Sequence, residues 1–179
     1  MHLDDQDILT LFTTKGKEQI AFGHLVNKYQ ERVYWHIRKM VINHEDANDV
    51  TQNTFIKVWK GLPKFKKEAN LFTWMYRIAT NETLNFIKAN KRRVAQSIED
   101  IQIENRKDDS FFSGEEIEAK LYKAIGTLPD KQKLVFNMKY FEELKYREIA
   151  EILGGSVGSL KASYHHAQKK IEAHLTNND

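Results

Sequence analysis

The chain of 179 residues contains no cysteine and only two prolines. The absence of cysteine excludes disulfide bonds, cysteine-ligated zinc and thiol redox chemistry. No apolar run approaches the roughly 20 residues that a membrane-spanning helix needs. The N-terminal stretch MHLDDQDIL is acidic and lacks the apolar core of a secretory signal peptide. We therefore expect a soluble cytoplasmic protein with no membrane insertion and no cofactor.

The distribution of apolar residues favours an all-α fold. There is no glycine-rich stretch and there are few β-branched runs. Apolar residues recur at helical spacing within residues 8–12 and then in a long stripe from Phe22 to Met40. A third helix is expected to end at Gly61, and a fourth is expected to begin at a cap formed by Asn70.

The net charge of +3 is distributed unevenly along the chain. Residues 60–93 carry nine Lys/Arg against two Asp/Glu, whereas residues 94–116 carry two against seven. We expect two small helical domains, residues 1–93 and 117–179, joined by a flexible acidic linker at residues 94–116. Most charge runs are only solvated helix faces. The aromatic residues interleaved with the basic run instead favour nucleic acid as its partner, because basic clusters attract phosphate.

The segment from Leu128 to Lys170 has the order of elements of a helix-turn-helix. A short helix near residues 146–153 is followed by a tight turn at Gly154 and Gly155 and by a longer helix that Ser156 caps. The second helix of such a motif enters the DNA major groove. A three-helix packing unit with no role in DNA binding is the alternative. The residues expected on the outward face of the last helix are Ser159, Lys161, Ala162, His165 and His166.

Residues 57–93 combine positive charge with flat rings. Unpaired bases stack on aromatic side chains, and each such contact is worth about 1–3 kcal/mol. Duplex DNA hides its bases, so exposed rings indicate an opened strand or a flipped base. Phe72 is better explained as a core residue, and for Trp74 both interpretations stay open. The candidate DNA contacts of the segment are Lys57, Phe65, Trp74, Arg77, Asn81, Arg92 and Arg93.

Several motifs in order resemble those of bacterial RNA polymerase sigma factors. Residues 44–59, HEDANDVTQNTFIKVW, resemble conserved region 2.2, and residues 72–81, FTWMYRIATN, resemble regions 2.3 and 2.4. The block from Leu128 to Lys170 is similar to region 4, and the missing region 3 domain matches the small extracytoplasmic-function (ECF) group. The resemblance implies a non-enzymatic protein that binds core RNA polymerase, recognises the −35 and −10 elements of promoter DNA and helps to open the duplex.

The resemblance also implies roles for matched positions in the first domain. The loop from Leu62 to Asn70 resembles the loop that captures a flipped −10 base, and Phe65 and Asn81 match positions that line its pocket. Lys57 matches a contact to the non-template strand. The polymerase β subunit is a further implied contact of the chain. The residues implied to dock on the clamp coiled coil of the polymerase β′ subunit are Asp49, Gln52, Phe55 and Trp59.

In the second domain the resemblance covers the helix that reads the −35 element. Lys161, Ala162, His165 and His166 match reading positions. Many members carry arginine where this chain has Ser163 and His166. Arginine pairs bidentately with guanine, whereas histidine is a weaker donor, so the −35 preference stays open. The acidic linker resembles a segment threaded through the polymerase cleft, and an anti-sigma factor is a possible further partner.

Two other classes of function fit parts of the sequence. A helix-turn-helix regulator that acts without polymerase fits residues 128–170, but the first domain lacks the alternating strands and acidic pocket of a receiver. For an enzyme acting on nucleic acid, Asp46 and Asp49 offer two neighbouring carboxylates, but no further acidic cluster or phosphate-binding loop accompanies them. Adjacent His165 and His166 point about 100° apart on a helix, which disfavours a shared metal ion.

Overall fold

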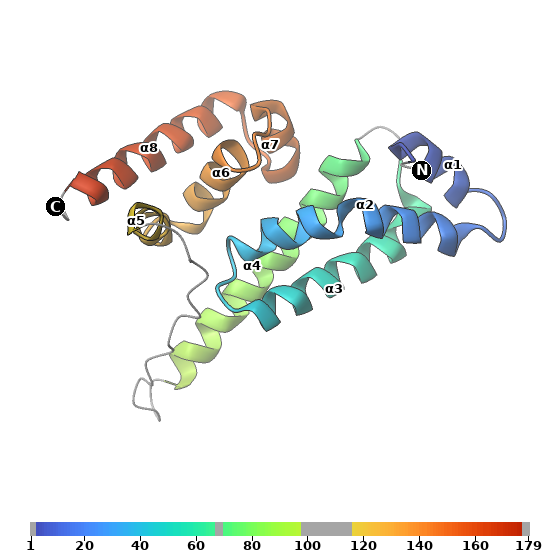
Figure 1. Cartoon of the computed structure of the whole chain (residues 1–179), viewed down its shortest axis with the longest axis horizontal. Helices are drawn as coiled ribbons and strands as arrows, with labels where there is room; N and C mark the ends of the chain where they lie inside the picture. The colour runs from blue at the N-terminus through green and yellow to red at the C-terminus, as the bar shows by residue number, and fades with distance from the viewer. Residues whose placement is uncertain (1–2, 67–69, 98–115, 177–179) are drawn as a thin grey trace. The chain divides into compact units, whose positions relative to one another are not determined.

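The computed structural model describes residues 3–66, 70–97 and 116–176. These residues contain helices and no strand, which confirms the all-α prediction. None of the helices within these ranges is long and apolar enough to cross a bilayer. The elements, in chain order, are α1 (Asp5–Phe12), α2 (Glu18–Arg38), α3 (His44–Gly61), the short 3-10 helix η1 (Leu62–Lys64), α4 (Leu71–Ser97), α5 (Glu116–Gly126), α6 (Asp130–Tyr140), α7 (Tyr146–Leu153) and α8 (Val157–Thr176) (Figure 1).

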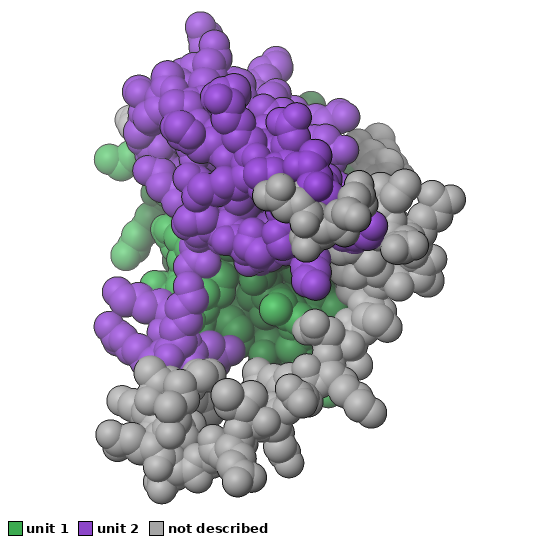
Figure 2. All heavy atoms as spheres, turned by 90° about the vertical axis from the view of Figure 1, so that its left-hand side faces the viewer, with its two compact units in different colours: residues 1–87 green, residues 88–179 purple. Residues whose placement is uncertain are grey.

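The chain divides into two compact units, residues 1–87 and 88–179 (Figure 2). The division falls inside α4, which continues to Ser97 and so enters the stretch expected to be the linker. Residues 94–97 contain neither glycine nor proline, so nothing in this sequence ends the helix at residue 93. Residues 98–115 of the expected linker lie outside the described residues, and its last residue, Glu116, begins α5.

In the first unit α2 and α3 lie side by side (Figure 1). The side chain of Asn43 accepts a hydrogen bond from the backbone N–H of Asp46 at 3.0 Å, and this cap begins α3. Asn43 therefore separates α3 from the apolar stripe that ends at Met40. Residues with no exposed surface in this unit include Ile8, Leu25, Val33, Ile37, Ala47, Val58, Met75 and Ala79.

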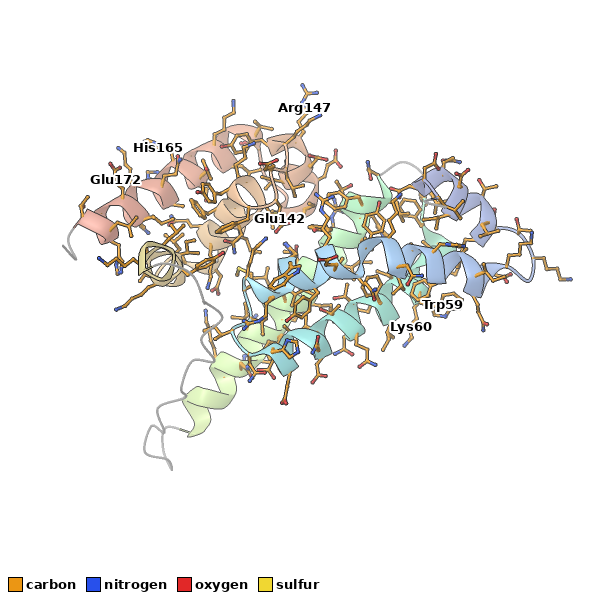
Figure 3. All side chains as sticks on the ribbon, in the orientation of Figure 1. Trp59, Lys60, Glu142, Arg147, His165 and Glu172 are labelled. Atoms are coloured by element: carbon orange, nitrogen blue, oxygen red, sulfur yellow. The ribbon has the colours of Figure 1, made fainter. Side chains whose placement is uncertain are left out.

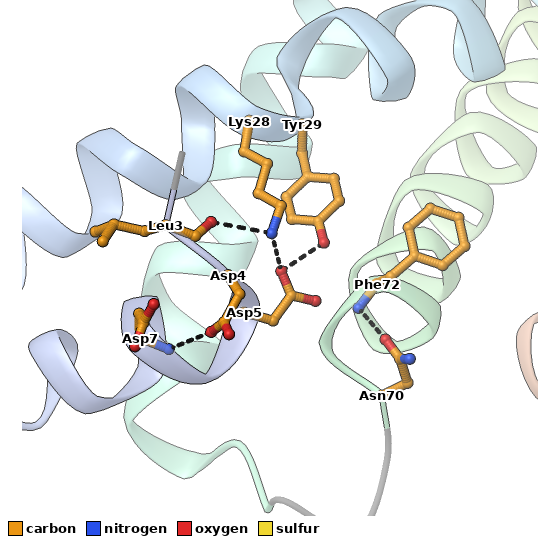
Figure 4. A network of polar contacts seen from close by, with 8 residues as sticks. All are labelled: Leu3, Asp4, Asp5, Asp7, Lys28, Tyr29, Asn70 and Phe72. Carbon is orange, nitrogen blue, oxygen red and sulfur yellow. Dashed lines mark hydrogen bonds and ion pairs between the residues drawn. The ribbon is translucent and has the colours of Figure 1, made fainter. Parts of the chain in front are cut away.

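Helix α1 is fastened to α2 by polar contacts around Asp5 (Figure 4). Oδ1 of Asp5 accepts a hydrogen bond from the Tyr29 hydroxyl at 2.6 Å and pairs with Nζ of Lys28 at 2.8 Å. Nζ of Lys28 also donates to the carbonyl oxygen of Leu3 at 3.2 Å. Burial, and next the hydrogen bond to Asp5, raise the pKa of the Tyr29 phenol.

The second unit packs α5, α6 and α7 against α8. Aromatic side chains extend its core. The ring of Phe136 stacks on that of Tyr164 with centroids 5.6 Å apart, and Tyr122 stacks on Phe141 at the same separation. One cluster of buried residues in this core consists of Ala124, Ile125, Leu128, Phe136, Ala167 and Ile171.

The predicted helix-turn-helix is present as α7, a glycine turn and α8. Gly154 and Gly155 have φ of 74° and 90°, a backbone conformation that side chains with a Cβ rarely adopt. The N–H of Gly154 donates to the carbonyl of Ala150 at 2.8 Å and ends α7. Oγ of Ser156 accepts from the N–H of Ser159 at 3.1 Å, which confirms the predicted cap of α8.

Candidate polymerase and nucleic-acid interfaces

A surface groove of about 560 Å³ lies along α2 and α3. The four residues implied by the sequence to bind polymerase, Asp49, Gln52, Phe55 and Trp59, all line it. They follow one another along α3 at intervals of three or four residues, and residues at this spacing share one face of a helix. The remaining lining residues are Phe22, Val26, Gln30, Asn48, Thr51 and Ile56.

The four predicted residues differ in what a partner can reach. Phe55 is buried, whereas Asp49 and Gln52 are exposed at the rim of the groove. Trp59 is half-buried (Figure 3), and its ring meets that of Phe12 edge-on at 5.9 Å between centroids. Trp59 therefore also links α1 to α3. The polar rim offers groups to a partner, and the buried rings hold the groove together.

Sequence reasoning missed one exposed apolar residue of the groove. The side chain of Ile56 is 45% exposed although it is large and apolar. It lies four residues after Gln52, and that spacing was the available signal. A single exposed isoleucine is common on protein surfaces, and here it adds apolar surface to the groove.

Helix α4 carries a stripe of residues on one side. It begins at half-buried Trp74 and continues with exposed polar residues. At about 100° per residue, positions three, four and seven apart face the same side of a helix. The stripe contains the predicted residues Arg77, Asn81 and Arg92 and also Asn85, which sequence reasoning missed. The exposed residues of this stripe after Trp74 are Arg77, Asn81, Asn85, Lys88 and Arg92. The side chain of Arg93 lies outside the described residues.

Trp74 is held at the start of this stripe by two neighbours. Its ring centroid lies 5.0 Å from that of Phe65, a half-buried residue just after η1. A Cβ added at Gly61 would come within 3.0 Å of the Trp74 ring, so glycine allows the ring to pack against the end of α3. The structure thus brings the two predicted aromatic DNA contacts, Phe65 and Trp74, together.

The start of α4 follows the sequence prediction. The side chain of Asn70 accepts from the N–H of Phe72 at 2.9 Å (Figure 4). Phe72 is 7% exposed and its ring lies 4.2 Å from that of Tyr76, so it belongs to the core as expected. Residues 67–69 of the loop implied to capture a base lie outside the described residues.

Lys57 lies on α3 and is exposed, as a contact to DNA requires. Its Nζ is 2.6 Å from Oε1 of Glu82, which belongs to α4. Nothing in the sequence pattern singles out this pair, because the two residues are 25 positions apart.

The five residues predicted to read the −35 element are all exposed on α8, and Figure 3 labels one of them, His165. The opposite side of the helix carries Leu160 and Ala167, which have no exposed surface. The Ser159 hydroxyl donates to the carbonyl of Ser156 at 2.8 Å, so its proton belongs to the helix cap. Lys169 is exposed four residues after His165 and was missed by sequence reasoning, although its i+4 spacing was visible.

The described residues include no group of three or more His, Cys, Asp or Glu arranged to hold a metal ion. The rings of His165 and His166 are 6.3 Å apart between centroids.

The two units match two known sequence families. Residues 25–93 match Sigma-70 region 2, and residues 118–171 match Sigma-70, region 4. The chain is 30% identical to the RNA polymerase sigma-H factor of Pseudomonas aeruginosa, over 98% of this chain and 96% of that protein. It is also 30% identical to the ECF RNA polymerase sigma-E factor of Escherichia coli K12, over 95% of this chain and 93% of that protein.

Two solved structures share the fold. One is CnrH in complex with the cytosolic domain of CnrY, with a TM-score of 0.72 and 21% identity over 98% of this chain and 99% of that chain. The other is the sigma factor RpoE of Bartonella quintana in complex with the anti-sigma factor NepR. Its TM-score is 0.71, with 19% identity over 87% of this chain and 96% of that chain.

These observations define a two-unit, helix-turn-helix transcription protein. The chain belongs to the sigma-70 family of RNA polymerase sigma factors, within the ECF group. It acts in transcription initiation by binding core RNA polymerase and directing it to promoter DNA. Sigma factors are initiation factors and are not themselves catalytic enzymes.

Proposed function

We propose that residues 1–93 dock on polymerase and handle the −10 element, that residues 117–179 read the −35 element, and that residues 94–116 connect these two functions. The observation that carries this assignment is the gathering of separately predicted residues onto three surfaces. These are the groove along α3, the stripe of α4 and the exposed side of α8. The protein acts in the cytoplasm, together with the polymerase.

The groove along α2 and α3 is the proposed docking site for the coiled coil of the polymerase β′ subunit. Half-buried Trp59 and exposed Ile56 supply apolar surface, and exposed Asp49 and Gln52 supply polar contacts at the rim. Gln52→Ala is expected to weaken binding to core polymerase in a pull-down. Gln19→Ala removes an exposed glutamine of α2 that does not line the groove, and it serves as the matched control. Equal binding by both variants would contradict the docking site.

The stripe of α4, with Phe65 and Lys57, is the proposed surface for the opened −10 element. Aromatic rings stack on unpaired bases, basic groups contact phosphates, and the amide of Asn81 pairs with a base edge. Asn81→Ala is expected to impair promoter opening and to leave core binding intact. Asn27→Ala, at an exposed position of α2, is the control. Normal opening by the Asn81 variant would remove that residue from the site.

The exposed side of α8 is the proposed reader of the −35 element. The decisive experiment reconstitutes the protein with bacterial core polymerase and sequences the 5′ ends of the transcripts. Shared −35 and −10 motifs upstream of the start sites are the expected result. Tight, specific binding to isolated promoter duplex without polymerase, and no polymerase-dependent transcripts, would favour a helix-turn-helix regulator that acts alone.

An anti-sigma factor is a further proposed partner. The two structural neighbours were solved as complexes with another protein, and one of those partners is an anti-sigma factor. Copurification of a host protein that blocks transcription by the reconstituted enzyme would identify such a partner here.

A further inference from the structure

The pair formed by Lys57 and Glu82 joins the two helices that carry the candidate −10 surface. Nζ of Lys57 lies 2.6 Å from Oε1 of Glu82, within range of a charge-assisted hydrogen bond. The side chain of Lys57 is 55% exposed, but that of Glu82 is only 15% exposed. The carboxylate is therefore fixed against the protein, and the ammonium is the partner that can move.

No basic residue of α4 stands three or four positions from Glu82. The residues three and four positions away are Ile78, Ala79, Asn85 and Phe86, and none carries a charge. Glu82 directly follows Asn81, the residue proposed to contact a −10 base. An acidic side chain at this place is unexpected, because a DNA phosphate repels a nearby carboxylate.

We propose that Glu82 competes with the DNA backbone for Lys57 and thereby lowers the affinity of the −10 surface for single strands of any sequence. This inference rests on the proposed role of Lys57 as a contact to the opened strand. When Lys57 moves to a phosphate, the largely buried Glu82 carboxylate loses its partner and lies near added negative charge. A strand must therefore make enough base contacts to offset this cost. Glu82 raises sequence selectivity because it weakens the contribution of phosphate contacts to the affinity, and those contacts carry no sequence information.

The test uses the full chain assembled with core polymerase and two fluorescent single-stranded probes of equal length. One probe carries the non-template −10 sequence found by start-site sequencing, and the other is oligo(dT). Glu82→Gln is expected to tighten binding of both probes about 3- to 10-fold and to reduce the preference for the promoter sequence. The slope of log K against log salt should steepen by at most about 0.7, the value for one phosphate contact on a single strand, because Lys57 leaves the phosphate less often once Glu82 no longer holds it.

A double-mutant cycle assigns the effect to the pair. In a Lys57→Gln background, Glu82→Gln should give a clearly smaller gain, because no ammonium is released and only the repulsion between carboxylate and phosphate is removed. Glu82→Ala should tighten binding as much as Glu82→Gln does, because both variants lose the carboxylate. A gain seen only with Glu82→Gln would instead come from a new contact made by the glutamine. Thermal unfolding of each variant confirms that it is folded before binding is compared.

The contrary outcomes are distinct. Weaker or unchanged binding by the Glu82 variants, with weaker binding by Lys57→Gln, would overturn the competition and leave Lys57 as a strand contact. Unchanged binding by Lys57→Gln would overturn both the competition and the role of Lys57. Failure of the other −10 contacts would appear separately, as normal promoter opening by Asn81→Ala.

Discussion

The indole ring of Trp59 packs edge-on against the ring of Phe22, with centroids 5.0 Å apart and an interplanar angle of 66°. Phe12 of α1 meets the same indole from a second direction. The ring therefore joins three helices and also lines the groove proposed to bind polymerase. A change at Trp59 consequently affects folding and docking together.

Trp59→Ala should lower the free energy of unfolding by roughly 2–4 kcal/mol, because it removes a large, half-buried ring that two other rings contact. Gln52 is exposed and makes none of these ring contacts, so Gln52→Ala should change the free energy of unfolding by less than about 0.5 kcal/mol. Urea denaturation followed by circular dichroism measures both. Similar unfolding midpoints for the two variants would show that the aromatic contacts do not stabilise the first unit.

The stability of the protein should fall at alkaline pH through Tyr29. Burial and the hydrogen bond to Asp5 raise the pKa of its phenol in the folded state. Above about pH 10, the phenol of the unfolded chain loses its proton while that of the folded chain keeps it, so stability declines as pH rises. Relative to Tyr29→Phe, the wild type should lose up to about 1.4 kcal/mol per pH unit in this range.

The measurement for Tyr29 is the free energy of unfolding of both proteins between pH 8 and pH 11. Tyr29→Phe keeps the ring and removes only the hydroxyl, so the difference between the two curves isolates this group from other tyrosines and lysines. Parallel curves above pH 10 would mean that neither burial nor the hydrogen bond to Asp5 raises the pKa of the phenol.

Two helical glycines should respond in opposite ways to alanine. At Gly23, a Cβ would have no heavy atom within 4 Å, so Gly23→Ala should stabilise the protein by about 0.5–1 kcal/mol through helix propensity. At Gly61, the added Cβ would lie 3.0 Å from the Trp74 ring. Gly61→Ala should displace that ring, cancel the gain and weaken −10 binding.

Thermal unfolding and promoter opening by the reconstituted enzyme compare these two glycine variants directly. If Gly61→Ala stabilises the protein as much as Gly23→Ala and opens promoters normally, the position of the Trp74 ring does not require glycine at residue 61.

His166→Arg should change which −35 sequences the protein uses. His166 is exposed on the side of α8 proposed to face DNA, and arginine pairs bidentately with guanine. A guanine at the contacted position should gain about 1–3 kcal/mol of preference. Gln168→Arg adds the same charge at another exposed position of α8 and should strengthen binding without a change in preference. Transcription from a library of randomised −35 elements distinguishes the two results.

Local signals in the sequence predicted much of this fold. Asn70 and Ser156 were predictable as helix caps because a side-chain cap depends only on residues within one turn. The glycine turn of the helix-turn-helix was predictable for the same reason. The end of α4 was not predictable in this way: the composition becomes acidic after residue 93, but the helix continues to Ser97.

The sites were predicted only in part. Helical spacing placed Asp49 and Gln52 on one face, and the resemblance to sigma factors supplied their role. The partners of Trp74 and Lys57 could not be predicted, since Gly61 and Glu82 approach them only through tertiary packing between α3 and α4. Contacts between side chains distant in sequence produce no regular spacing of residue types from which they could be predicted.

The stripe of α4 imposes a constraint on how its gene can change. From Arg77 to Arg92 the helix rises about 22 Å, at 1.5 Å per residue. Inserting one codon between Asn81 and Lys88 would turn every later residue by about 100° and carry Lys88 and Arg92 off the shared side. An insertion of seven or eleven codons would lengthen the helix but return Lys88 and Arg92 to nearly the same side. Codon substitutions on this helix should therefore be tolerated far more often than single-codon insertions or deletions.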